Sequence, residues 1–288
     1  MTVAASSDSR AGRLDRDGVA QLTQLLEDDF GRATQPFEGV AANQFLLDAL
    51  DRGEHRSMSV WPTNAPVGVC YVGAGGLVVP AGLSEAASPL AAAVRPSGWR
   101  ILVGDLTLGE AIVEQSGAGL FRRRPYAREQ RLMVLDTAAG APEHCPGLRR
   151  ATLGDLERLT DFACGLHVED EMGPPLSRSG RSAVQQRVAA SIRRGSSWTI
   201  ERSGRPVGKI DVSIQSRRRG GQLAGVFVDP HERGRGLARR AIADLAHRLV
   251  RAGIPCVTLH VRADNQPALR AYEAAGFAER RRWLLALR

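Results

Sequence analysis

The sequence predicts an α/β (α+β) protein that is built from two domains. At 288 residues the chain is longer than one average domain and long enough for two hydrophobic cores. Segments with apolar residues at helical spacing alternate with short runs rich in β-branched residues, which indicates helices and strands along the whole length. A third observation is the stretch 137–147 (TAAGAPEHCPG), which lacks periodicity and contains glycine and proline. This composition is typical of a linker, so we expect a domain boundary there.

The expected organisation has four parts. Residues 1–14 are rich in Ser, Ala and Arg without periodicity, and we expect them to be disordered. The first domain covers 15–136, the linker 137–147 and the second domain 148–288. Each domain is therefore predicted to fold around its own core.

The first domain is expected to mix helices and strands and carries no recognisable chemistry. Its glycines at positions 73, 75 and 76 lead into a strand-like run, so we interpret them as a hairpin turn and not as a phosphate-binding loop. The expected helices cover 16–30, 41–50, 84–94 and 106–115. The expected strands cover 67–72, 76–80, 99–104 and 130–135.

The second domain is expected to have the element order β-α-α-β-β-β-α-β-α-β. Thr152 is placed to cap its first helix, and Gly253 stands where a glycine typically follows the end of a helix. The other expected helices cover 182–194, 236–251 and 266–275. The expected strands cover 148–151, 198–201, 207–214, 223–228, 256–262 and 277–287.

Composition argues against several classes of function. The net charge of +8 and the pI of about 10.2 suggest an anionic partner, but Lys209 is the only lysine and the arginines are scattered, so nucleic acid is not expected. The four cysteines are far apart and show no CxxC spacing, so neither a metal site nor a disulfide framework is expected. Without an apolar run of ~18 residues or a signal-peptide pattern, we expect a cytoplasmic protein that does not bind a membrane.

The stretch 226–238 (VFVDPHERGRGLA) reads as a buried strand that passes through a basic glycine turn into a helix. Glycines let backbone N–H groups converge on one point, and the helix N-terminus adds the positive end of its dipole. Such a turn is a phosphate cradle. A dinucleotide-binding sheet is a poorer interpretation, because Gly234 and Gly236 lie five or more residues beyond the strand and three consecutive strands precede the helix.

With this turn, the sequence over about residues 148–288 resembles the GNAT superfamily of acyl-CoA-dependent N-acyltransferases. The turn Arg233-Gly234-Arg235-Gly236-Leu237-Ala238 matches the family pattern Arg/Gln-x-x-Gly-x-Gly/Ala. A second family motif follows at the right distance, in the segment 265–277 with Asn265 and Tyr272. The resemblance implies tandem GNAT-like domains, each a mixed, mostly antiparallel twisted sheet flanked by helices, of which the first is a degenerate copy without the glycine turn. It also implies acetyl-CoA as cosubstrate and a primary amine as acceptor, with direct attack on the thioester.

The resemblance implies a set of cofactor-binding residues. The backbone of Val226, Phe227 and Val228 would pair with the pantetheine arm, while their side chains stay in the core. Backbone amides of the loop from Gly234 to Ala238 would hold the pyrophosphate, and small residues suit that role because no side chain is needed. The further cofactor-binding candidates are Arg233, Arg235, Arg239 and Asn265. Asn265 has a structural alternative as the N-cap of a helix, and the two arginines after Gly234 have one as solvated helix-face residues.

The resemblance also implies the catalytic residues. Tyr272 would protonate the thiolate leaving group, a general-acid role that a phenol can fill. Many relatives carry an acidic base five residues before the motif asparagine, and this chain has His260 there, so His260 is the candidate general base. Glu169, Asp170 and Glu171 lie between the first two helices of the second domain, where relatives bind the acceptor, and are either acceptor-binding residues or a solvated loop.

Several alternatives stay open at this level. The missing carboxylate base leaves room for an acyl-CoA-binding sensor, or a tandem protein that holds a partner, without transfer. The acyl group can be longer than acetyl, depending on the space beside Phe227. The acceptor amine can be a small molecule, a peptide or a protein, because variable loops set acceptor specificity. A homodimer is one option for assembly.

Overall fold

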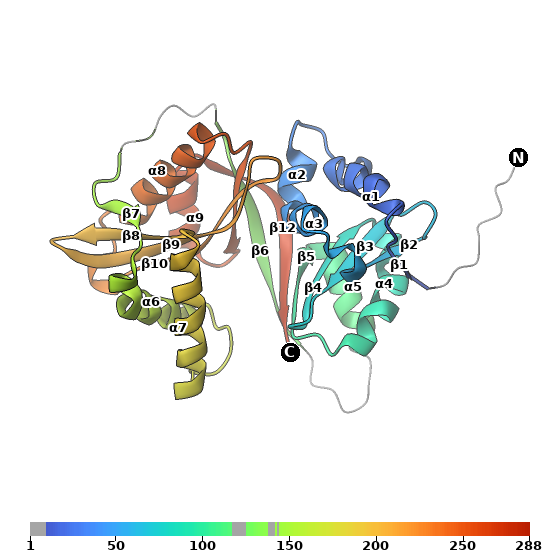
Figure 1. Cartoon of the computed structure of the whole chain (residues 1–288), viewed down its shortest axis with the longest axis horizontal. Helices are drawn as coiled ribbons and strands as arrows, with labels where there is room; N and C mark the ends of the chain where they lie inside the picture. Colours follow the sequence, from blue (N-terminus) through green and yellow to red (C-terminus); the bar gives the residue numbers. More distant parts are fainter. Residues whose placement is uncertain (1–9, 117–124, 138–141, 143) are drawn as a thin grey trace, which may run out of the picture. The chain divides into compact units, whose positions relative to one another are not determined.

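The computed structural model describes residues 10–116, 125–137, 142 and 144–288 (Figure 1). The chain forms two compact units. The first comprises Met1–Leu132 together with Arg281–Arg288, and the second comprises Met133–Arg280. Each is a mixed α/β unit, so the predicted fold class is confirmed.

The part of the sheet in the first unit has the strand order β1-β2-β3-β4-β5-β12. Its neighbours pair antiparallel, except that β4 and β5 are parallel. The strands are β1 (Gly12–Arg13), β2 (Met58–Trp61), β3 (Gly68–Val72), β4 (Leu77–Gly82), β5 (Ile101–Asp105) and β12 (Phe277–Leu287). The helices are α1 (Gly18–Glu27), α2 (Glu38–Ala42), α3 (Gln44–Asp51), α4 (Ala87–Val94) and α5 (Leu106–Ser116). Helices α4 and α5 cover one core cluster, in which Trp99 is fully buried.

The part of the sheet in the second unit has the strand order β6-β11-β10-β9-β8-β7. Strand β10 is parallel to β11 and antiparallel to β9. The strands are β6 (Tyr126–Leu135), β7 (Leu148–Arg150), β8 (Ser197–Arg202), β9 (Arg205–Ser216), β10 (Gly220–Val228) and β11 (Val257–Arg262). Together with the helices below, the order predicted from the sequence for this half is confirmed.

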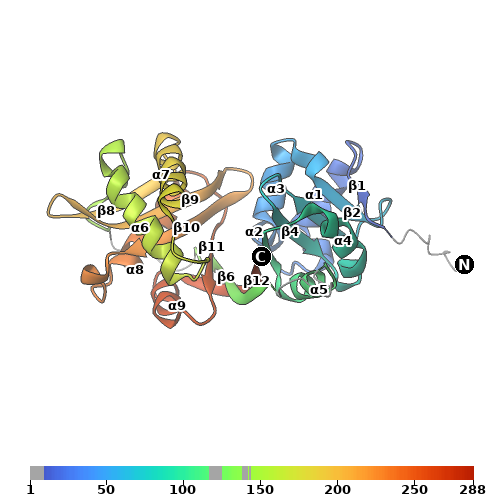
Figure 2. The same cartoon turned by 90° about the horizontal axis from the view of Figure 1, so that it is seen from below.

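Two pairs of helices cover the two faces of this part of the sheet (Figures 1 and 2). The helices are α6 (Leu156–Glu169) and α7 (Arg178–Arg193) on one face, and α8 (Leu237–Arg251) and α9 (Gln266–Glu273) on the other. Strand β10 contributes to both cores, since Leu223 packs with α8 and Phe227 with α6 and α7. Among the helices of the described residues, none combines the length and apolar character needed to cross a bilayer.

Strands β6 and β12 each run from one unit into the other. Residues 133–135 of β6 belong to the second unit, and residues 281–287 of β12 belong to the first, where Trp283 to Leu287 pair with β5. The units therefore differ from the expected domains 15–136 and 148–288 at both strands. The physical reason is burial: Leu284 and Ala286 are 2% and 0% exposed in the core of the first unit.

Some local expectations differ from the structure. Residues 10–14 were expected to be disordered, but β1 pairs with β2, and Leu14 is buried and donates its N–H to the Met58 carbonyl (3.0 Å). The rest of that segment, 1–9, lies outside the described residues, as do 138–141 and 143 of the expected linker. The end of the linker is packed, because buried Cys145 donates its N–H to the Asp244 carboxylate (2.9 Å).

Candidate functional site

Strand β10 stops pairing with β11 halfway along its length. Their parallel pairing runs from Gly221↔Val257 to Leu223↔Leu259 and stops there, although β10 continues to Val228. Beside this point β10 carries a one-residue bulge, because three steps along it match two steps along β9, and Gly225 has φ +59°. Within the described residues, the side of β10 that faces β11 thus has no ladder partner beyond Leu223.

Val226, Phe227 and Val228 lie in this unpaired part of β10. The Phe227 ring packs on Phe162 (5.4 Å between centroids), and Val228 is buried among the residues of the α8 core. Phe227 and Val228 remain paired with β9 on their other side. Only their backbone groups toward β11 are therefore placed to meet a ligand, which is the role expected for them; that role stays a prediction.

The glycine turn follows β10 and leads into α8. Gly234 and Gly236 have φ +76° and +69°, in the left-handed region that glycine adopts without strain. A Cβ at Gly234 would meet no atom within 4 Å, so the space in front of the turn is open. The first intrahelical bond runs from the Arg240 N–H to the Gly236 carbonyl, so the N–H groups of Leu237, Ala238 and Arg239 have no partner inside the helix. The turn has the geometry of an anion site.

The arginines of the turn are placed differently from one another. The Arg233 guanidinium binds both oxygens of Glu169 (2.8 and 2.9 Å) and donates to the Val228 carbonyl (2.9 Å). Arg235 pairs with Glu232 (2.8 Å), whereas Arg239 is exposed. The structure thus joins Arg233, a predicted cofactor residue, to Glu169, a predicted acceptor residue.

Asn265 is the N-cap of α9. Its Oδ1 accepts a hydrogen bond from the Ala268 N–H (3.2 Å), which confirms the structural interpretation of this residue. Its Nδ2 makes no hydrogen bond with the rest of the described chain. A second contact to a ligand is therefore compatible with the cap.

Tyr272 lies on α9 and is 7% exposed. Burial, and to a smaller extent the charge of Asp170, raises the pKa of its hydroxyl well above the usual range. The phenol is therefore fully protonated at neutral pH. It can donate a proton or a hydrogen bond, as its predicted role requires.

His260 lies on β11 and is partly buried. Burial lowers the pKa of its imidazole to about 4. The ring is therefore neutral at neutral pH and can accept a proton, but it is a weaker base than an ordinary histidine. Its neighbour Arg262 donates to the Glu169 carbonyl (2.8 Å) at the end of α6 and pairs with Asp264 (2.6 Å).

The acidic run at the end of α6 does not form one patch. Glu169 is the last residue of the helix and is paired with Arg233, so it was wrongly placed in a loop. Asp170 is the C-cap and lines a cleft, and Glu171 follows with φ +47°. The sequence could not separate these environments because the helix end was not predicted within the run.

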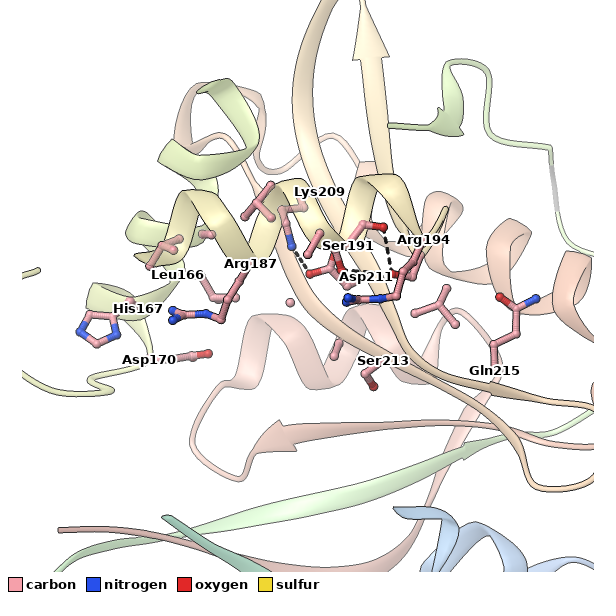
Figure 3. A pocket seen from close by; sticks show the side chains of 18 of the residues that line it. Leu166, His167, Asp170, Arg187, Ser191, Arg194, Lys209, Asp211, Ser213 and Gln215 are labelled. Atoms are coloured by element: carbon pink, nitrogen blue, oxygen red, sulfur yellow. Dashed lines mark hydrogen bonds and ion pairs between the residues drawn. The ribbon is translucent and has the colours of Figure 1, made fainter. Parts of the chain in front are cut away.

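The cleft lies between α6, α7 and strands β9 and β10 and has a volume of about 1030 Å³ (Figure 3). Lys209 and Asp211 form an ion pair in it, and the lysine is 3% exposed. Ser197 donates to Asp211 (2.8 Å). A Cβ on the bulge residue Gly225 would lie 2.9 Å from Asp211 Oδ2 and 3.2 Å from Lys209 Nζ, so the ion pair lies directly beside the bulge.

Sequence reasoning missed this ion pair. The signal was present: the only lysine of the chain stands two residues before an aspartate within an apolar strand. Charged residues at alternate positions of a strand point to the same face. Buried charges are rarely found unless they are paired, so the spacing could have identified the pair.

The model of the acetyltransferase (GNAT) family matches residues 166–277, which include the glycine turn, Asn265 and Tyr272. The N-alpha-acetyltransferase RimI of Mycobacterium tuberculosis is 30% identical over 131 residues, which cover 44% of this chain and 74% of that protein. The mycothiol acetyltransferase of Brachybacterium faecium is 44% identical over 59 residues, which cover 20% of this chain and 18% of the relative. The chain therefore spans about a fifth of the length of that relative.

Solved structures match the fold of nearly the whole chain. A GCN5-related N-acetyltransferase from Sphaerobacter thermophilus has a TM-score of 0.63 at 17% identity, covering 99% of this chain and 96% of that one. A tandem GNAT protein from the clavulanic acid biosynthesis pathway has a TM-score of 0.54 at 14% identity and covers 96% of both chains. The tandem fold expected from the sequence is thus confirmed.

Proposed function

Because the chain belongs to the GNAT acetyltransferase family, whose members use acyl-CoA, we propose that it is an acetyl-CoA-dependent N-acetyltransferase that acts on a primary amine. The observation that carries the proposal is the end of the ladder between β10 and β11 next to an open glycine turn. An unpaired strand edge accepts an extended chain through backbone hydrogen bonds, and the turn accepts a pyrophosphate. Coenzyme A contains both in succession: an extended pantetheine arm that can pair with the strand edge, and a pyrophosphate that can bind at the turn.

In this proposal the second unit alone holds the donor. The backbone of Val226 to Val228 pairs with the pantetheine arm, and the N–H groups of residues 234–238 bind the pyrophosphate. Arg235 and Arg239 add charge-assisted contacts to phosphate, and the Nδ2 of Asn265 contacts the arm. Arg233 acts through Glu169: the ion pair ties the turn to the end of α6 and fixes its position.

The transfer proceeds in a ternary complex. The nitrogen lone pair of the neutral amine forms a bond to the thioester carbonyl carbon, and the C–S bond then breaks. The Tyr272 hydroxyl donates a proton to the departing thiolate, and the surplus proton of the nitrogen leaves to a base. No covalent enzyme intermediate is needed, so the products are the amide and free CoA.

His260 is the proposed base, directly or through a water molecule. With its pKa lowered to about 4, it is unprotonated throughout the neutral range and ready to accept a proton. The same low pKa makes the transfer to it unfavourable from an ammonium ion, so the acceptor must bind as, or become, the free amine. The need for a free amine predicts a rate of acetyl transfer that rises with pH toward the pKa of the acceptor.

The test is calorimetry with acetyl-CoA followed by an assay of thiol release against a panel of amines, peptides and aminoglycosides. One relative is named an N-alpha-acetyltransferase, so free α-amino groups belong in the panel. Binding together with amine-dependent release of thiol supports the proposal. Absence of acetyl-CoA binding by the intact protein contradicts it.

A second candidate is an acyl-CoA-binding protein without transfer activity. The weak basicity of His260, at a position where many relatives carry a carboxylate, favours it. Such a protein binds acetyl-CoA but releases no thiol with any amine of the panel. The length of the acyl group is decided in the same assay by comparing acetyl-CoA with longer acyl-CoA donors.

A further inference from the structure

The wall of the cleft formed by α7 carries polar residues at helical spacing. Arg187, Ser191 and the C-cap residue Arg194 lie at positions i, i+4 and i+7 and all line the cleft. Residues at this spacing share one face of a helix. The adjacent face, with Val184 and Val188, is buried against α6.

The two arginines on this wall lack partners among the described residues. Neither guanidinium makes an ion pair or a hydrogen bond with another described residue. Arg181 on the same helix differs, because it pairs with Glu157 and Asp161 (2.5 and 2.8 Å). Figure 3 shows Arg187 and Arg194 extending from α7 into the cleft. A guanidinium presents a rigid fork of N–H donors that suits carboxylate and phosphate groups.

The charges that line the cleft are not balanced. Four cationic side chains face it, but only two carboxylates. The cations are Lys209, Arg187, Arg194 and Arg217, and the carboxylates are Asp170 and Asp211. Lys209 and Asp211 neutralise each other in their buried pair. A singly charged amine would therefore meet a net positive surface, which disfavours its approach.

The bulge in β10 sets the orientation of an acceptor in the cleft. The proposed thioester lies along β10, where Ala224 and Gly225 line the cleft and Gly225 lies beside Asp211 Oδ2. An acceptor must bring its nitrogen to this end, where Asp211 is the nearest carboxylate on the cleft side. Its remaining part then extends along α7.

We propose that the cleft binds an acceptor that carries an anionic group in addition to its amine, with the anion held by Arg187 and Arg194 and the nitrogen directed to the Gly225 bulge. The inference rests on the proposed function for the orientation of the acceptor. A carboxylate and a phosphate share the chemistry that these two side chains recognise. The acceptor class is therefore a zwitterionic amine, such as an amino acid, a peptide or an amine phosphate.

The test compares matched probes by calorimetry with the CoA-saturated full-length protein. 6-Aminohexanoate is paired with 6-aminohexanamide, and O-phosphoethanolamine with ethanolamine. We expect at least one anionic probe to bind about tenfold or more tightly than its counterpart without the anionic group, the effect of hydrogen bonds to a charged group. The better anionic probe identifies carboxylate or phosphate as the group recognised.

The variant Arg187→Gln/Arg194→Gln should lose this preference and keep its affinity for CoA. Arg193→Gln is the matched control, because Arg193 is exposed on the same helix but does not line the cleft. Equal binding within both pairs, no binding of any probe, or a preference that survives the double substitution would overturn the inference. Thiol release is read separately: an anionic preference without release contradicts the proposed transfer and leaves the binding site in place.

Discussion

The two units have the same strand connectivity, but their parallel strands differ beyond the last pair of the ladder. In the second unit, β10 continues past the last pair Leu223↔Leu259 without a partner on that side. In the first unit, β4 and β5 also stop pairing after Val78↔Leu102, yet Pro80 of β4 lies against Gly104 of β5. A Cβ on Gly104 would come within 2.8 Å of the Pro80 ring, so the strands are already in contact there. Proline also has no N–H to offer an added strand.

The turns that follow these strands differ in the same way. A Cβ on Gly82, which ends β4 with φ +132°, would lie 2.4 Å from Gly68 Cα and from the Val67 carbonyl oxygen. A Cβ on Gly234 would meet nothing within 4 Å. One glycine permits close packing of backbone and the other leaves an open anion site. A shared topology therefore says where a site can form, and the residues of the parallel strands and their turn decide whether it does.

The largest effect is expected for Tyr272→Phe, which removes the proposed proton donor. The rate constant kcat should fall about 100-fold or more, with little change in acetyl-CoA affinity, because general-acid catalysis contributes about 10²–10⁴. Tyr71→Phe in the first unit is the control: it removes a hydrogen bond to Glu54 (2.8 Å) and should leave kcat unchanged. Steady-state kinetics of both variants decide the point, and an unchanged kcat in Tyr272→Phe would remove its assigned role.

A large loss of stability is expected when the buried ion pair is broken. Lys209→Met leaves Asp211 without its cation and should lower the free energy of unfolding by about 3 kcal/mol. Arg52→Met in the first unit breaks the more exposed pairs with Asp48 and Glu54 and should lower it by about 1 kcal/mol or less. Urea unfolding measures both. Similar losses in the two variants would show that burial of Lys209 is not what makes its pair important.

The low pKa of His260 predicts a dependence of stability on pH. Below about pH 6.5 the unfolded chain binds a proton at this residue and the folded chain does not, so stability falls as the pH drops from about 6.5 to about 4. The loss is on the order of 2 kcal/mol, allowing for partial exposure of the ring. His260→Gln should show a correspondingly smaller decrease between pH 7 and pH 4.5 in urea titrations. Parallel curves for the two proteins would contradict the assigned burial.

The smallest effect on stability is expected for the exposed ion pair between Arg233 and Glu169. Glu169→Gln should lower the free energy of unfolding by less than about 1 kcal/mol, because both side chains are 44% exposed. If this ion pair positions the glycine turn, the affinity for acetyl-CoA should nevertheless fall severalfold. Glu157→Gln on the same helix, which loosens the pair with Arg181, is the control and should not change that affinity. Calorimetry with both variants tests the positioning role, which equal affinities would exclude.

Much of the second unit could be predicted from its sequence because its signals are local. The helical spacing in α8, the cap at Asn265 and the glycine after α8 each depend on residues close in sequence. The positions of β6 and β12, which each run from one unit into the other, could not be predicted in this way, since they depend on pairing with strands far away in the chain. Strand β1 was missed because it has two residues, too few for a periodic pattern.

The candidate site likewise has parts that local sequence predicts and parts that depend on residues far apart in the chain. The glycine turn was found because its residues are contiguous, whereas the cleft gathers α6, α7, β9 and β10 and has no contiguous signature. The ion pair of Arg233 with Glu169 joins residues 64 positions apart. Such pairings follow from tertiary packing, which the pattern of a single sequence does not determine.

The central claim is that the glycine turn and the unpaired edge of β10 in the second unit, and not the corresponding parts of the first unit, bind the donor. Titration calorimetry of acetyl-CoA into the wild type, Gly234→Asp and Gly75→Asp tests it most directly. Both glycines stand in turns with no atom within 4 Å of an added Cβ, so neither new side chain meets a steric clash, while the φ of +76° at Gly234 adds backbone strain there. We predict one molecule bound per chain, at least about tenfold weaker binding in Gly234→Asp because a carboxylate would oppose the pyrophosphate, and no change in Gly75→Asp. Two molecules per chain, or equal affinity in Gly234→Asp, would contradict the claim.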